Sequence, residues 1–118
     1  MPRPRGNHLS RGVESELRVA LDLVERGWDV FSPVVGAPAD CDLVAVSRTT
    51  GRCVRVEVKT CAFVHQRADG SGLAYANAPP PHKRHKHDTV AFVLRDGSIR
   101  YVPDMIGQEA FVEARQSA

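Results

Sequence analysis

The alternation of valine with charged residues in R-C-V-R-V-E-V-K-T-C (52–61) constrains the fold of this chain more than any other feature. Side chains along a β-strand point in turn to the two sides of a sheet, so the three valines share one face. Glu57 and Lys59 then stand side by side on the other face. The segment is predicted to be a strand that packs on one side and presents an acid beside a base on the other. Read alone, the charged side is also consistent with a face that is simply solvated.

Nearer the N-terminus, the segment from Gly12 to Arg26 has the periodicity of an amphipathic helix. Ser10 is its expected N-cap and Gly27 its expected C-terminal stop. Its predicted apolar side comprises Val13, Leu17, Ala20, Leu21, Leu23 and Val24. Strands are predicted at 28–35, 41–47, 52–61, 88–95 and 98–102, with a further short one within 73–78, and a last helix from Pro103 to about Gln116. The order α-β-β-β-(loop)-β-β-α predicts an α/β fold in which a central mixed sheet is flanked by helices.

A chain of 118 residues is expected to hold one domain, here residues 12–118, preceded by a flexible basic arm over residues 1–11. No apolar run approaches the length of a membrane span, and no signal peptide is evident. The three cysteines are odd in number and fit no disulfide framework, which favours a reducing, cytoplasmic location.

Two further acids occupy positions where acids are disfavoured. Glu16 falls within the apolar side of the predicted helix, where a carboxylate needs a compensating cation, metal or donor unless it reaches water at the edge of that side. Asp42 begins the strand 41–47, and a symmetric turn over 48–51 places it opposite Glu57. Two facing carboxylates repel each other, and Mg²⁺ would convert them into a ligand pair. Asp40 is the alternative acid if the strand begins earlier.

These residues together resemble the PD-(D/E)XK nuclease superfamily. Asp42 is followed, after 14 residues, by the E-x-K triplet Glu57-Val58-Lys59, and a G-x-x-x-E helix containing Glu16 precedes them. The helix and the stretch that ends in Y-V-P (101–103) are similar to a branch that includes archaeal-type Holliday junction resolvases and a homing endonuclease of a group I intron. The literal Pro-Asp dipeptide of the superfamily is missing, so the choice between Asp40 and Asp42 stays open.

The resemblance implies a restriction-endonuclease-like core and a Mg²⁺-dependent DNA endonuclease, in which Mn²⁺ can replace Mg²⁺. The implied catalytic residues are Glu16, Asp42, Glu57 and Lys59, and the implied metal ligands are Asp42, Glu57 and the Val58 carbonyl. A Holliday junction resolvase acting on branched DNA as a homodimer is the first expectation. A homing or restriction-type enzyme on duplex DNA, a non-catalytic DNA-binding relative and a protein-interaction module are the alternatives. The last helix is the expected dimer interface, through Met105, Ile106, Phe111 and Val112.

Phosphate contacts require cations, and although the net charge of the chain is only +2, cations are concentrated in two segments that contain no acid. The residues predicted to contact DNA phosphate are Arg3, Arg5 and Arg11 in the arm and Lys83, Arg84 and Lys86 in the run 82–87. The same run is consistent with a solvated loop, or with zinc bound by Cys61, His65 and the histidines at 82, 85 and 87. Cys41 and Cys53 are expected to be small packing residues.

Overall fold

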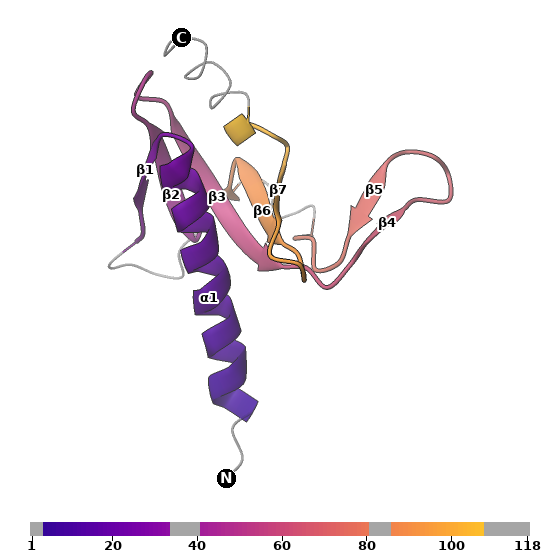
Figure 1. Cartoon of the computed structure of the whole chain (residues 1–118). Helices are drawn as coiled ribbons and strands as arrows, with labels where there is room; N and C mark the ends of the chain where they lie inside the picture. Colours follow the sequence, from indigo (N-terminus) through magenta and orange to yellow (C-terminus); the bar gives the residue numbers. More distant parts are fainter. Residues whose placement is uncertain (1–3, 34–40, 81–85, 108–118) are drawn as a thin grey trace.

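The computed structural model describes residues 4–33, 41–80 and 86–107, with the side chains of α1 from residue 12 onward. One helix is followed by seven strands (Figure 1). They are α1 (Pro4–Glu25), β1 (Trp28–Phe31), β2 (Leu43–Ser47), β3 (Cys53–Thr60), β4 (Val64–Gln66), β5 (Leu73–Tyr75), β6 (Thr89–Val93) and β7 (Ile99–Val102). No helix within these residues is both long enough and apolar enough to cross a membrane.

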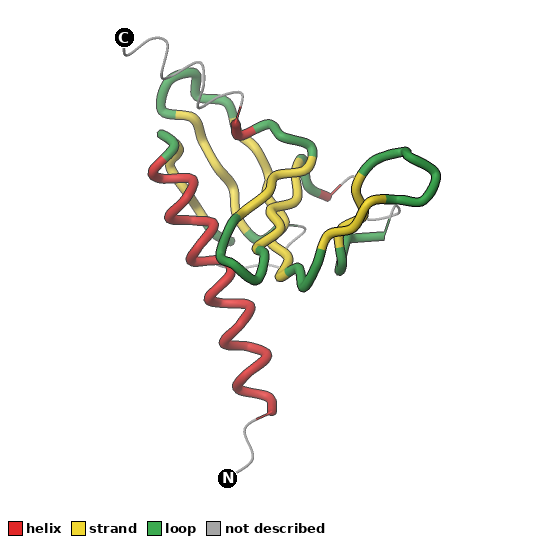
Figure 2. The backbone as a smooth tube through the Cα atoms, turned by 45° about the vertical axis from the view of Figure 1, so that its right-hand side comes forward, coloured by secondary structure: helices red, strands yellow, loops and turns green. Residues whose placement is uncertain are grey.

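Five of the strands form the central sheet, in the order β1-β2-β3-β6-β7. Only β3 and β6 pair in parallel, which makes the sheet mixed, while β1–β2, β2–β3 and β6–β7 are antiparallel. The helix α1 lies across one face of the sheet, and β4 and β5 form a separate two-stranded ribbon that projects to one side (Figures 1 and 2). The predicted mixed α/β architecture is therefore confirmed.

The helix differs from the prediction at its start and in its orientation. It begins at Pro4, a residue suited to a first helical position, so residues 4–11 continue the helix instead of forming an arm, and Ser10 is not a cap. It ends as predicted before Gly27, whose φ of 96° suits glycine and whose amide donates to Val24 O at 3.1 Å.

The side of α1 that faces the sheet is the row Ser15, Val19 and Leu23, each buried. Of the predicted apolar side, Leu23 is buried and Ala20 is partly buried against the core, whereas the rest of the prediction was wrong. Its other large members are exposed: Val13 by 54%, Leu17 by 60%, Leu21 by 64% and Val24 by 43%. Both rows have helical spacing, and periodicity alone cannot tell which one meets the sheet.

The core lies between α1 and the sheet. It contains Val19, Leu23, Trp28, Leu43, Ala45, Val54, Val56, Val58, Ala91, Val93, Tyr101 and Ile106. A smaller cluster on the opposite face consists of Cys61, Val90 and Phe92, against which Tyr75 of β5 packs. Cys41 is buried as expected, whereas Cys53 is exposed, which corrects its expected packing role.

The carboxyl end of the chain is described only to residue 107. Ile106 is completely buried in the core and Met105 packs against it, so Ile106 is not available for the predicted dimer interface. Phe111, Val112 and the remainder of the predicted last helix lie outside the described residues. The predicted final hairpin is present as β6 and β7, whereas β4 was not predicted.

Candidate active site

The strand β3 has the burial predicted from its sequence. Val54, Val56 and Val58 are buried, whereas Glu57 and Lys59 are half-buried on the alternate positions. Across the parallel pairing, Glu57 is aligned with Val90 and Lys59 with Phe92. Because its three valines are buried, β3 can occupy a central place in the sheet, between β2 and β6, although it also carries three charged residues. The alternation of side chains directs Glu57 and Lys59 to the same side of the strand.

Asp42 lies directly before β2 and is tied to β3 by two hydrogen bonds. Its amide donates to Val56 O at 3.0 Å, and its Oδ2 accepts from the Val58 amide at 2.8 Å. The two bonds flank Glu57 on its own strand. The β2–β3 register, with Leu43 opposite Val56, is the one that the symmetric turn predicts, so the expected proximity of the two acids is confirmed. The alternative acid Asp40 lies outside the described residues.

Glu16 is half-buried on α1 and close to Asp42. Burial raises the pKa of the Glu16 carboxyl, and the negative charge of Asp42 together with a hydrogen bond to it raises that pKa further. The carboxyl thus has a partner that favours its protonated form, which is the state expected of two neighbouring acids without a cation between them.

All four predicted catalytic residues line one pocket of about 350 Å³ where α1 meets the end of β3. Its lining consists of Gly12, Val13, Ser15, Glu16, Asp42, Glu57, Val58, Lys59 and Thr60. Residues from three separate segments of the sequence are therefore brought together by the packing of α1 on β3 and by the β2–β3 pairing.

Two residues of this pocket were not predicted. Ser15 Oγ and Thr60 Oγ1 share a hydrogen bond of 2.7 Å that joins α1 to β3, next to Glu16 on one side and Lys59 on the other. The bond fixes the helix against the strand at the point where both contribute to the pocket. Ser15 could have been recognised as a polar residue in the helical row that faces the sheet, but the wrong row was predicted to face it.

The donor set suits a hard divalent cation. Three carboxylates line the pocket, and two of them interact closely enough to raise the pKa of Glu16. In the described part of the chain, no three His, Cys, Asp or Glu side chains are grouped tightly enough to hold a metal ion by themselves. Mg²⁺ keeps several waters and often takes only one or two carboxylates from the protein, so the pocket fits Mg²⁺ better than a zinc site with a full set of side-chain ligands.

The predicted phosphate-binding residues are only partly visible. Arg3, Lys83 and Arg84 lie outside the described residues, and Arg5 and Arg11 belong to helical backbone whose side chains are not described. Lys86 is half-buried and His87 is buried, so His87 is not part of an exposed basic loop.

The zinc alternative loses one of its residues. The thiol of Cys61 is fully buried and donates to Phe63 O at 3.2 Å, which withdraws it from the expected zinc set.

Comparison with known proteins links this arrangement to a nuclease fold. No protein-family model and no curated protein matches the chain. Among solved structures, the bacterial homing endonuclease I-Ssp6803I matches with a TM-score of 0.51 at 14% sequence identity, over 81% of this chain and 70% of the other. The chain therefore has a fold similar to that of this endonuclease.

Proposed function

We propose that the protein is a DNA endonuclease that hydrolyses phosphodiester bonds with the help of Mg²⁺, for which Mn²⁺ can substitute. The observation that carries the proposal is the pocket in which Glu16, Asp42, Glu57 and Lys59 meet. The resemblance of the sequence to PD-(D/E)XK nucleases and the similar fold of a homing endonuclease support the same activity.

Asp42 and Glu57, with the Val58 carbonyl beside them, are the groups that would hold Mg²⁺. The bound cation would polarise the scissile phosphate and lower the pKa of water in the site. The hydrogen bond from the Val58 amide fixes the Asp42 carboxylate against β3, next to Glu57 in the sequence of that strand. A carboxylate fixed in this way loses less conformational freedom on binding.

Lys59 supplies the positive charge of the pocket. Its ammonium group would stabilise the charge that develops on the phosphoryl oxygens and orient the attacking water. Glu16 would accept a proton from water or hold Lys59 in position. Its raised pKa brings the carboxyl closer to the pH range in which a general base works well.

Linear duplex DNA is the substrate that we favour over a four-way junction. The matched solved structure is that of a homing endonuclease, and the ribbon β4–β5 gives the chain a projecting element separate from the central sheet. The Holliday junction resolvase activity expected from the sequence is the alternative, and it differs in substrate rather than in chemistry.

Cutting both strands of a duplex requires two sites, so we propose a homodimer. The surface that we assign to the second copy is formed by Leu17, Leu21 and Val24, which are exposed on α1 and do not line the catalytic pocket; it takes the place of the interface expected around Ile106. Leu17 and Val24 also line a groove of about 420 Å³ between α1 and β1, whose lining includes Phe31 as well as Glu16 and Asp42. Apolar patches of this kind are unusual on monomeric proteins.

The central experiment is cleavage of a duplex library and of a four-way junction, with Mg²⁺, with EDTA, and with Glu57→Gln in place of the native chain. We expect cleavage only by the native chain with Mg²⁺. Cleavage that persists in EDTA or in Glu57→Gln would refute the mechanism. Selective cutting of the junction would replace the duplex with the branched substrate while leaving the chemistry in place.

A further inference from the structure

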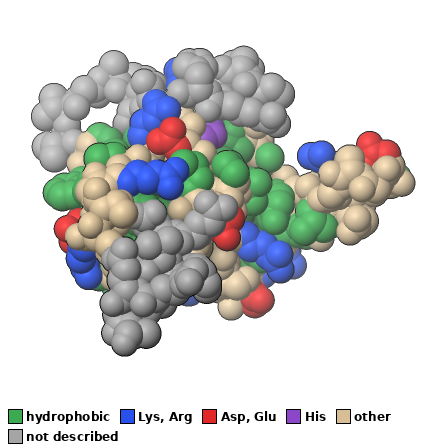
Figure 3. All heavy atoms as spheres, turned by 90° about the horizontal axis from the view of Figure 1, so that it is seen from above, with side chains coloured by type: hydrophobic (Ala, Val, Ile, Leu, Met, Phe, Trp, Pro, Cys, Tyr) green, Lys and Arg blue, Asp and Glu red, His purple; other side chains and the backbone are tan. Residues whose placement is uncertain are grey.

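The ribbon β4–β5 projects from the body of the molecule, on the side away from α1 (Figures 1 and 3). Its first strand begins at Val64, a few residues after Lys59 on the same continuous stretch of chain. Its pairs are Val64 with Tyr75, His65 with Ala74, and Gln66 with Leu73. The element that follows β3 along the chain is thus an exposed two-stranded ribbon.

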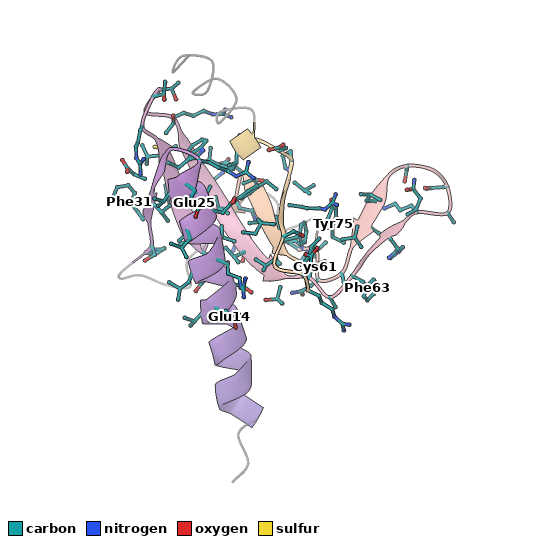
Figure 4. All side chains as sticks on the ribbon, viewed as in Figure 1. Glu14, Glu25, Phe31, Cys61, Phe63 and Tyr75 are labelled. Carbon is teal, nitrogen blue, oxygen red and sulfur yellow. The ribbon has the colours of Figure 1, made fainter. Side chains whose placement is uncertain are left out.

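The base of the ribbon is fixed to the central sheet. The ring of Tyr75 stacks on Phe92 of β6, with centroids 4.5 Å apart and an angle of 12° between the planes. Asn77 Nδ2 donates to Thr60 O at 3.3 Å, and the Ala76 amide donates to Phe63 O at 3.1 Å. Cys61 and Tyr75 lie where the ribbon joins the body (Figure 4). The ribbon therefore has a defined direction relative to Lys59.

The tip of the ribbon is closed by local hydrogen bonds. The Arg67 amide donates to Gly72 O at 2.9 Å, and the Gly70 amide donates to Arg67 O at 3.1 Å. Asp69 Oδ1 accepts from the Ser71 amide at 2.9 Å, and hydrogen bonding from the Ser71 side chain, followed by that from its amide, lowers the pKa of Asp69. Gly70 and Gly72 have φ values of 76° and 126°, a backbone conformation that would be strained for a residue with a side chain. The backbone of the tip is therefore closed by its own hydrogen bonds.

Long polar side chains on β4 and just after it lie opposite small residues on β5 and just before it. His65 lies opposite Ala74, and Arg67 lies opposite Gly72, so neither is crowded by the facing strand. His65 and Arg67 alternate with Gln66 and therefore share one side of the ribbon. All three are exposed. Arginine reads guanine through paired hydrogen bonds to O6 and N7, and a major groove of about 12 Å admits a two-stranded ribbon.

We propose that β4–β5 enters the major groove of duplex DNA next to the cleaved phosphate and reads base edges, with Arg67 recognising a guanine and His65 a neighbouring base. The inference rests on the proposed function and adds its specificity element. The ribbon carries Asp69 as well as Arg67, so it has little net charge. A nearly neutral ribbon contributes sequence discrimination more than general attraction to phosphates.

The test measures binding to a randomised library of linear duplexes in Ca²⁺, where the native chain is first used to select its preferred sequence. We expect that sequence to contain a guanine whose replacement weakens binding about 10- to 100-fold. Arg67→Ala should remove this preference while leaving the affinity for unselected duplex and its salt dependence unchanged. Arg52→Ala is the matched control, because it removes the same charge at the opposite end of β3 and should retain the preference.

Three results would overturn the inference. One is the absence of any sequence preference in the native chain. Another is an Arg67→Ala variant with unchanged discrimination. The third is an equal loss of affinity for all duplexes with a reduced salt dependence, which would make Arg67 a phosphate contact. Melting temperatures of both variants establish that they are folded. Failure of the native chain to bind or cleave any DNA would instead refute the proposed function, so the two failures are distinguishable.

Discussion

The two faces of β3 differ in what they contribute to the molecule. On one face Val54, Val56 and Val58 are buried in the core, whereas on the other Glu57 and Lys59 are half-buried in the candidate site. The same eight residues thus hold the fold together and place its charged groups. Because neighbouring positions serve different ends, substitutions one residue apart are expected to have different and separable effects.

The largest expected effect is on the charged face. Lys59→Met should lower the rate of DNA cleavage by about 10²- to 10³-fold, since it removes a preorganised charge from the transition state. The free energy of unfolding should change by less than about 0.5 kcal/mol, because Lys59 is not part of the core. Cleavage kinetics and urea denaturation measure the two quantities. A loss of stability comparable to the loss of activity would erase the distinction between the faces.

The next effect concerns metal binding on the charged face. Mg²⁺ at 100 times its dissociation constant should stabilise the native chain by about 2.7 kcal/mol and raise its melting temperature. Glu57→Gln should abolish most of this shift, while the apolar face is left intact. Thermal denaturation with and without Mg²⁺ measures it. An equal shift in native chain and variant would place the metal elsewhere.

On the apolar face, Val56→Ala should reduce the free energy of unfolding by about 2 kcal/mol through lost burial and the resulting cavity. The rate of cleavage by the folded fraction should stay within about twofold of the native rate. Denaturation and single-turnover kinetics at low temperature test both. A large loss of activity with unchanged stability would contradict the separation of the two faces.

The smallest effect is a change in titration. Asp42→Asn removes the charge that contributes to raising the pKa of Glu16, so this pKa should fall while remaining above its usual value because burial persists. In the metal-free native chain, Glu16 should therefore lose its proton at a higher pH than in the variant. The rate of cleavage by the native chain should decline as the pH falls through this raised pKa, since Glu16 must be ionised to accept a proton from water. NMR titration of the Glu16 carboxyl provides the measurement, and an unchanged pKa would contradict the proximity of the acids.

The sequence was sufficient to predict β3, its register with β2 and the meeting of Asp42, Glu57 and Lys59, because strand alternation and a short turn are local constraints. The side of α1 that faces the sheet was harder to predict. Two rows of residues on α1 have equivalent helical spacing, and the row that packs on the sheet is the one that contains Ser15, Val19 and Leu23. The hydroxyl of Ser15 shares a hydrogen bond with that of Thr60.

The ribbon was only half predicted. β4 is three residues long and mostly exposed, so it has no apolar alternation that a sequence could reveal. It is held through the stack of Tyr75 on Phe92, a contact between distant residues.

The hydrogen bond from the Val58 amide to Asp42 has a consequence for how the protein can be observed. This amide sits between Glu57 and Lys59, and its acceptor is a side chain rather than a backbone carbonyl. Its rate of hydrogen exchange and its chemical shift therefore depend on the state of Asp42. A single backbone resonance should report protonation, metal occupancy and substrate arrival without any label in the pocket.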